Sequence, residues 1–112
     1  MTNKKLNTRL YEKMFAEQEV YRSWLLSQPP EEILNHAYEY VMREDILLSL
    51  EYNDLTDGQA KALLKSPASL ADIFKDWEKR ETGRMEDIRE TIESRANKII
   101  REEFIRSKRE ER

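Results

Sequence analysis

The chain has 112 residues, no cysteine, and 20 basic against 23 acidic residues, which gives a net charge of −3. Without cysteine it has no disulfide, no thiol catalysis and no cysteine metal site, and a reducing cytoplasm is the expected location. With 38% charged residues and only two glycines and three prolines, the composition predicts long helices and no sheet, an all-α fold in one domain spanning 1–112.

The first predicted helix begins at a cap on Asn7 or Thr8 and ends near Ser27. Short polar side chains are favoured at that position because they accept hydrogen bonds from the first free N–H groups of a helix. Residues 1–6 are mostly polar, so we expect them to be frayed. Apolar residues at helical spacing predict one buried stripe: Leu10, Met14, Tyr21 and Leu25, widened by Tyr11, Phe15 and Trp24.

The second predicted helix, 29–52, opens with Pro29 and Pro30, followed by Glu31 and Glu32. Proline suits the first turn of a helix, and the helix dipole favours carboxylates there. After Glu44 the apolar residues occur all round the axis, so we expect other helices to cover this half on every side and the chain to be organised around it. The predicted stripe comprises Ile33, Leu34, Ala37, Tyr38, Val41 and Leu48.

Two further helical runs follow. Thr56 and Gln59 have the spacing of a capping box, which predicts a short helix from about Asp57 to Lys65. Ser69 predicts the cap of a last run, 69–108, of about 40 residues and roughly 60 Å, which is too long for a compact domain of this size. We therefore expect this helix to kink or break near Thr82-Gly83, or to project, with 107–112 frayed. Its apolar positions are 70, 73, 74, 77, 85, 88, 92, 96, 99 and 100. The fold predicted is a compact bundle of four to five helices with a long C-terminal helix.

No group of residues has the pattern of an active site. His36 is the only histidine, so it cannot form a two-histidine metal face. Glu44 and Asp45 could serve as acid and base in a cleft, but such carboxylates more often pair with Arg43 or a basic residue of a neighbouring helix. We expect no enzyme, no metal and no cofactor.

Charge is unevenly distributed and defines two candidate surfaces. Residues 21–58 carry two basic and eight acidic groups, and 95–112 carry seven and four. The acidic stretch predicts a protein-binding face with aromatic anchors: Glu31, Glu32, Glu39, Tyr40, Glu44, Asp45, Glu51 and Tyr52. The basic end is the alternative, a nucleic-acid contact interrupted by glutamates: Lys98, Arg101, Arg106, Lys108 and Arg109.

Four segments carry a resemblance to a known family: PPEEILNHAYEY (29–40), REDIL (43–47), DLTDGQAKALLKSP (54–67) and ADIFKDWEKRE (71–81). The stretch from Leu10 to Asn97 resembles an uncharacterised family of short proteins, a domain of unknown function, carried on conjugative transposons and related mobile elements of gut Firmicutes. The resemblance implies an accessory protein of a mobile element, and it supplies no catalytic residues.

Two functions follow as expectations. In the first, the acidic helix occupies the basic nucleic-acid groove of a protein partner such as a Cas nuclease, and the chain acts as an anti-CRISPR or anti-restriction antagonist without turnover. In the second, the basic end makes the chain a nucleic-acid-binding regulator or conjugation accessory protein. An uncovered apolar seam on the last helix would also permit a homodimer. No membrane contact is expected, because no apolar run approaches the roughly 20 residues of a membrane span.

Overall fold

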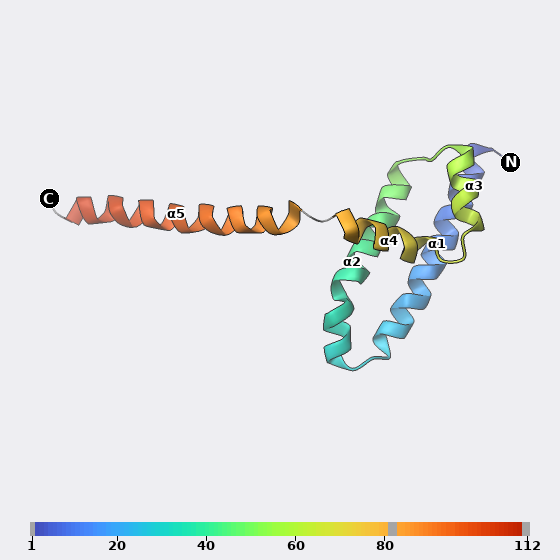
Figure 1. Ribbon diagram of the computed structural model, residues 1–112, viewed down its shortest axis with the longest axis horizontal. Coiled ribbons are helices and arrows are strands. Elements are labelled where there is room, and N and C mark those ends of the chain that lie inside the picture. Colours follow the sequence, from blue (N-terminus) through green and yellow to red (C-terminus); the bar gives the residue numbers. More distant parts are fainter. Residues whose placement is uncertain (1, 81–82, 111–112) are drawn as a thin grey trace. The chain divides into compact units, whose positions relative to one another are not determined.

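A computed structural model describes residues 2–80 and 83–110 (Figure 1). All its regular elements are helices: α1 (Asn3–Leu26), α2 (Pro30–Tyr52), α3 (Asp57–Lys65), α4 (Ser69–Arg80) and α5 (Arg84–Glu110). The all-α prediction and the long last helix are confirmed. Contacts divide the chain into two compact units, residues 1–78 and 79–112.

The core of the first unit is built on α1. Leu6, Leu10 and Met14 follow one another at four-residue spacing and are buried, so they form one stripe of the helix. α1 lies beside both α2 and α3 (Figure 1). The buried stripe packs against one buried residue from each later helix of the unit: Leu47 of α2, Ala60 of α3 and Leu70 of α4.

The start of α1 differs from the prediction. Thr2, rather than Asn7 or Thr8, is the cap, and its hydroxyl accepts a hydrogen bond from the Lys5 N–H at 3.3 Å. Residues 3–6 are therefore helical and not frayed, because burial of Leu6 in the core extends the helix towards the amino terminus. Buried Leu10, Met14 and Leu25 confirm the predicted stripe, whereas its expected margins, Phe15 and Trp24, are exposed.

Polar side chains of α1 hold the segment that contains α3. Asn7 bonds both backbone groups of Leu55: its Oδ1 accepts from the N–H at 2.8 Å and its Nδ2 donates to the carbonyl at 3.0 Å. Six residues further along α1, Lys13 Nζ donates to the carbonyls of Leu64, at 2.6 Å, and Ser66. These bonds join residues 48 to 53 positions apart in the sequence.

The prediction that the chain is organised around α2, with the half after Glu44 covered on every side, is wrong. Only Arg43 and Leu47 of this helix are buried. Four residues of its predicted stripe are exposed within the first unit: Leu34, Ala37, Val41 and Leu48. The physical reason is that α3 and α4 are short, with 9 and 12 residues, and pack on the side where α1 lies, so they leave the opposite side of α2 bare.

The helix starts after residue 50 are partly as predicted. Thr56 and Gln59 form the full capping box: Thr56 Oγ1 accepts from the Gln59 N–H at 3.2 Å, and Gln59 Oε1 accepts from the Thr56 N–H at 3.0 Å. Ser69 is not a cap. It is the first residue of α4, and its hydroxyl donates to the Leu63 carbonyl at 2.6 Å.

The predicted 40-residue run is two helices. α4 ends at Arg80 and α5 begins at Arg84. The break expected at Thr82-Gly83 falls partly outside the described residues, which exclude 81–82. In the second unit, α5 extends over 27 residues and none of them is buried. Residues 107–110, expected to fray, are helical, and 111–112 lie outside the described part of the chain.

Candidate protein-binding surface

The inner side of α2 is fixed by a buried arginine. Arg43 donates from Nε and Nη2 to Glu39 Oε2, at 3.0 and 2.7 Å, and its side chain is only 7% exposed. Its guanidinium carbon lies 4.0 Å from the centre of the Tyr21 ring of α1. A planar guanidinium suits this position because it can pair with a carboxylate and stack on an aromatic ring at once. Arg43 thereby fastens α2 to α1.

Glu17 links the same cluster to α4. Its Oε2 lies 3.9 Å from Arg43 Nη1. Its two carboxylate oxygens also accept hydrogen bonds from the backbone N–H groups of Leu70 and Ala71, at 3.0 and 2.9 Å. These N–H groups belong to the first turn of α4, where helix N–H groups lack helical partners and the dipole favours negative charge. A side chain of α1 therefore caps α4.

Two buried polar atoms beside Arg43 have no hydrogen-bond partner among the described residues: Gln18 Oε1 and the Tyr21 hydroxyl. The amide nitrogen of Gln18 is bonded, to the Tyr40 carbonyl at 3.2 Å and to Glu44 Oε1 at 3.0 Å. Burial raises the pKa of Tyr21 above its usual 10.0, with a further increase from Glu39 and a partial offset from Arg43. This cluster is part of the packing between α1 and α2.

The outer side of α2 is a row of exposed apolar residues. Leu34, Val41 and Leu48 are seven residues apart and lie on one side of the helix, exposed by 75, 53 and 51%. Tyr52 continues the row one turn later and is 77% exposed. This surface, the outer face of α2, was predicted to be core. A spacing of seven in Leu34, Val41 and Leu48 was visible in the sequence, but only the structure shows that this row points away from α1.

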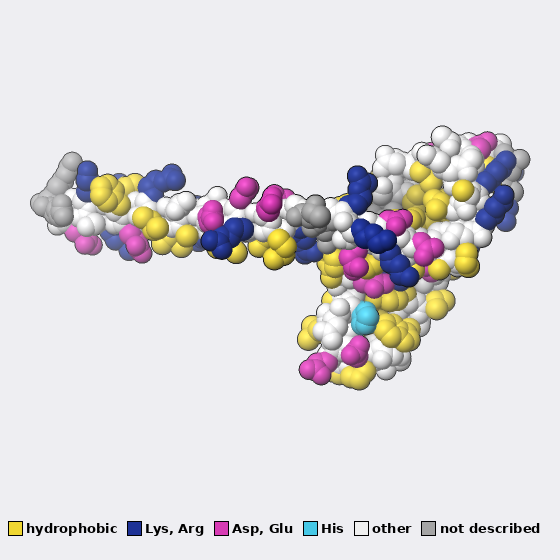
Figure 2. All heavy atoms as spheres, viewed as in Figure 1, with side chains coloured by type: hydrophobic (Ala, Val, Ile, Leu, Met, Phe, Trp, Pro, Cys, Tyr) yellow, Lys and Arg dark blue, Asp and Glu magenta, His cyan; other side chains and the backbone are white. Residues whose placement is uncertain are grey.

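Carboxylates flank this row. α2 has six acidic residues and one basic residue, Arg43, and because Arg43 is turned inward the exposed charges of α2 are all negative. Figure 2 shows Asp and Glu side chains at the end of the first unit where α1 and α2 are joined. Successive residues of a helix are turned by about 100°, which places the six acids in three pairs on three sides of α2. Glu31 and Asp45 border the apolar row on one side, and Glu44 and Glu51 border it on the other. The third pair, Glu32 and Glu39, lies away from the row.

The predicted partner-binding residues differ in their exposure. Glu31, Glu32, Glu44, Asp45, Glu51 and Tyr52 are exposed, while Glu39 and Tyr40 are half-buried. Three of the acids also make contacts within the unit. Glu39 pairs with Arg43, Glu44 accepts from Gln18, and Glu32 Oε2 lies 3.6 Å from His36 Nε2. The acids are therefore not one continuous patch, and those bordering the apolar row are the better placed for a partner.

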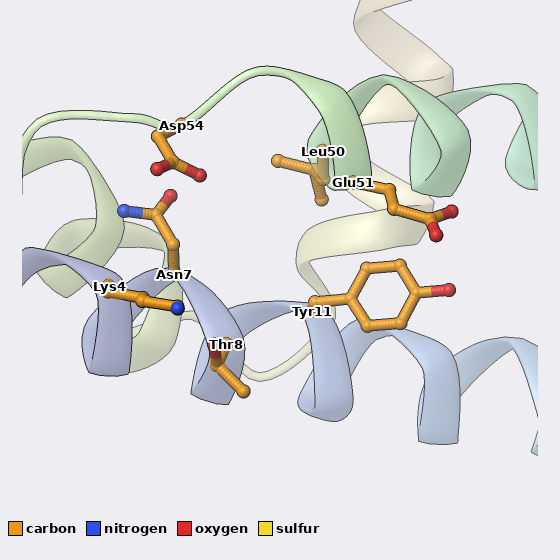
Figure 3. Close-up of a pocket in the computed structure, with 7 residues that line it drawn as sticks. All are labelled: Lys4, Asn7, Thr8, Tyr11, Leu50, Glu51 and Asp54. Carbon is orange, nitrogen blue, oxygen red and sulfur yellow. The ribbon is translucent and has the colours of Figure 1, made fainter.

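A hollow of about 350 Å³ lies at one end of the α1–α2 pair (Figure 3). Lys4 and Asp54 lie at one end of it and Tyr11 and Glu51 at the other, with Asn7 between the helices. Both polar atoms of the Asn7 amide already form hydrogen bonds with the backbone of Leu55. The amide of Asn7 therefore serves the fold.

A second hollow, of about 320 Å³, lies between the end of α1 and the start of α2. It is largely apolar and borders the outer face of α2 through Val41. The sequence placed several of its residues in the core. Its lining comprises Arg22, Leu25, Leu26, Ile33, Ala37, Tyr40 and Val41.

On α5, the residues of the alternative site are all exposed: Lys98, Arg101, Arg106, Lys108 and Arg109. Six basic and three acidic residues fall within 95–110, against two and four within 84–94. The helix therefore has an acidic first part and a basic second part.

Metal and membrane signatures are absent from the described ranges. No group of three or more His, Cys, Asp or Glu there is arranged to hold a metal ion. Within 2–80 and 83–110, the helices are either too short or too polar to cross a membrane.

A family model matches residues 6–100, which cover α1 from its fourth residue, all of α2, α3 and α4, and α5 as far as residue 100. The chain belongs to the family described as protein of unknown function, DUF3848. The expectation of an uncharacterised family is confirmed, and the DUF3848 match begins at Leu6, the first core residue of α1. No curated protein and no solved structure matches the chain.

Proposed function

We propose that this DUF3848 protein acts by binding a protein partner, without turnover, through the outer face of α2. The observation that carries the proposal is an exposed apolar row bordered on both sides by carboxylates, with Arg43, the one basic residue of the helix, turned inward. Protein interfaces have this anatomy, since an apolar centre with aromatic anchors supplies affinity and a charged rim supplies orientation. Tyr52 is the exposed aromatic anchor of the row.

The kind of partner follows from charge. Residues 1–78 hold nine basic and fourteen acidic groups, and the six acids of α2 provide much of that excess. A basic groove that ordinarily binds nucleic acid is the complementary surface. With the resemblance to mobile-element proteins, this charge favours a host-defence nuclease as the partner, such as a Cas effector or a restriction enzyme, and an antagonist role for the chain.

Competition with nucleic acid tests this proposal. A fluorescent DNA duplex is bound to a purified defence nuclease, and its anisotropy is followed as the chain is added. The chain is expected to displace the DNA, less effectively as salt rises. A variant with Glu31→Gln, Asp45→Asn and Glu51→Gln should lose the effect. A control with Glu12→Gln, Glu19→Gln and Asp76→Asn changes the same charge on exposed residues of α1 and α4 and should keep it.

Two results would contradict the proposed binding through the outer face of α2. No displacement across a panel of Cas and restriction nucleases, or equal loss in both triple variants, would refute a specific role for α2.

The alternative, direct nucleic-acid binding, is favoured by the six basic residues exposed within 95–110. It predicts that the chain retards DNA or RNA in a gel, and that removing residues 98–112 abolishes the shift.

A further inference from the structure

α5 has an apolar seam, and none of the residues of this helix is buried. Met85, Ile88, Ile92, Ala96 and Ile99 follow one another at spacings of three or four residues, which places them on one side of the helix. Ile100 and Phe104 extend the seam from Ala96 at four-residue spacing. Figure 2 shows hydrophobic side chains along one side of this helix. All its large apolar residues are exposed: Met85, Ile88, Ile92, Ile99, Ile100, Phe104 and Ile105.

A helix that buries none of its residues lacks the packing contacts that stabilise most helices in proteins. Most helical stability in proteins comes from packing of an apolar face, and α5 buries no residue among those described. Ion pairs along the helix, such as Arg89 Nε to Glu93 Oε1 at 2.7 Å, supply only a small part of what is needed. The seam, 20 residues long from Met85 to Phe104, is long enough for a two-helix pairing of about three heptads.

Charge selects the occupant of the seam. The first part of α5, 84–94, has a net charge of −2, and the second part, 95–110, has +3. A second copy of α5 in the opposite direction places each acidic part against a basic part. A parallel copy places like charges together, which is unfavourable at the edges of a helix pair. The small side chain of Ala96, near the middle of the seam, allows close approach there.

We infer that two copies of the chain associate through α5 in antiparallel orientation, with Ile88, Ile92 and Ile99 at the centre of the contact. The inference is independent of the outer face of α2, because that face is in the other unit. A dimer of this kind displays two copies of the first unit, so that a bivalent partner binds with increased avidity.

Sedimentation equilibrium of the full chain over a range of concentrations tests the association. The chain should be a concentration-dependent dimer, and Ile92→Lys should raise the dissociation constant by on the order of a hundredfold or more, because two buried isoleucines are lost per dimer. Val41→Lys on α2, at a β-branched residue of similar exposure, is the matched control and should leave the dissociation constant of the dimer unchanged. A wild-type monomer at all concentrations overturns the inference. A dimer weakened by Val41→Lys and not by Ile92→Lys also overturns it.

Orientation is tested separately, and the absence of cysteine in the chain makes the experiment clean. A spin label is attached to Ser107→Cys, at an exposed polar position of α5, and the distance between the labels of the two copies is measured. For an antiparallel pair centred on Ala96 the backbone positions are about 33 Å apart, at 1.5 Å per residue. For a parallel pair they are about 10 Å apart. The short distance would overturn the antiparallel arrangement.

Discussion

Replacing Arg43 by methionine is the sharpest test of how α1, α2 and α4 are held together. The substitution keeps an unbranched side chain of similar reach but removes the charge. Glu39 then loses two hydrogen bonds of 3.0 and 2.7 Å, and Glu17 loses its nearest basic group at 3.9 Å. The two carboxylates are only 25 and 21% exposed, so water compensates them incompletely.

The magnitude follows from that burial. Removing one partner of a fully buried ion pair costs about 3–5 kcal/mol. Here the carboxylates keep some solvent, and Glu17 keeps its two bonds to α4, so we expect a loss of about 2–3 kcal/mol. A unit of 78 residues has a free energy of unfolding of roughly 4–12 kcal/mol. The expected decrease in melting temperature is roughly 10–20 °C.

Tryptophan fluorescence is the suitable assay. The chain has two tryptophans, Trp24 and Trp77, and both lie in the first unit, so their signal follows the unfolding of that unit. Urea denaturation of wild type and variant then gives the difference in free energy. Arg22→Met, at an exposed arginine of α1, is the control and should change stability by less than about 0.5 kcal/mol. If Arg43→Met and Arg22→Met were equally mild, the buried cluster would not be what fastens α2 to α1.

Three further predictions concern the same unit. Glu17→Gln should destabilise it by about 1–2 kcal/mol in urea denaturation, because an amide supplies one acceptor and no charge to the start of α4; an unchanged midpoint would contradict that cap. Tyr21→Phe should be neutral or stabilising at pH 7, since it removes a buried hydroxyl without a partner. Because burial raises the pKa of Tyr21, the folded protein keeps the phenolic proton to a higher pH than the unfolded chain does. Titration of Tyr21 therefore leaves the free energy of unfolding unchanged below about pH 10 and lowers it as the pH rises above that value. In urea denaturation at high pH, wild type should lose more stability than Tyr21→Phe. Thr56→Ala should cost about 1 kcal/mol through loss of the capping box, measured the same way, with exposed Thr8→Ala as the comparison.

Local signals in the sequence predicted the helices well. The Pro29-Pro30 start of α2 and the Thr56 capping box are determined by residues within four positions of each other, and both are confirmed. The stripe of Leu10, Met14 and Leu25 was also visible, because one side of a long helix repeats the same spacing several times.

Signals that depend on distant residues were missed. α4 starts at Ser69 because Glu17, more than 50 residues earlier, caps it, and no local pattern shows that. The buried side of α2 was misassigned for a related reason. Its inner side contains Arg43, which looks like a surface residue until Glu39, Glu17 and Tyr21 surround it, whereas apolar Leu34, Val41 and Leu48 look like core. Because α2 has apolar residues on two of its sides, the apolar pattern alone could not identify which side is buried.

Asn7, Lys13 and Glu17 of α1 hold the segment 55–71 through hydrogen bonds to its backbone groups. Evolution should therefore constrain the two partners unequally. Asn7, Lys13 and Glu17 have specific donors or acceptors and should tolerate few replacements. Leu55, Leu64, Leu70 and Ala71 contribute only peptide groups to these bonds, which every residue except proline possesses in full, so what restricts the side chains of Leu55, Leu64 and Leu70 is their packing in the core.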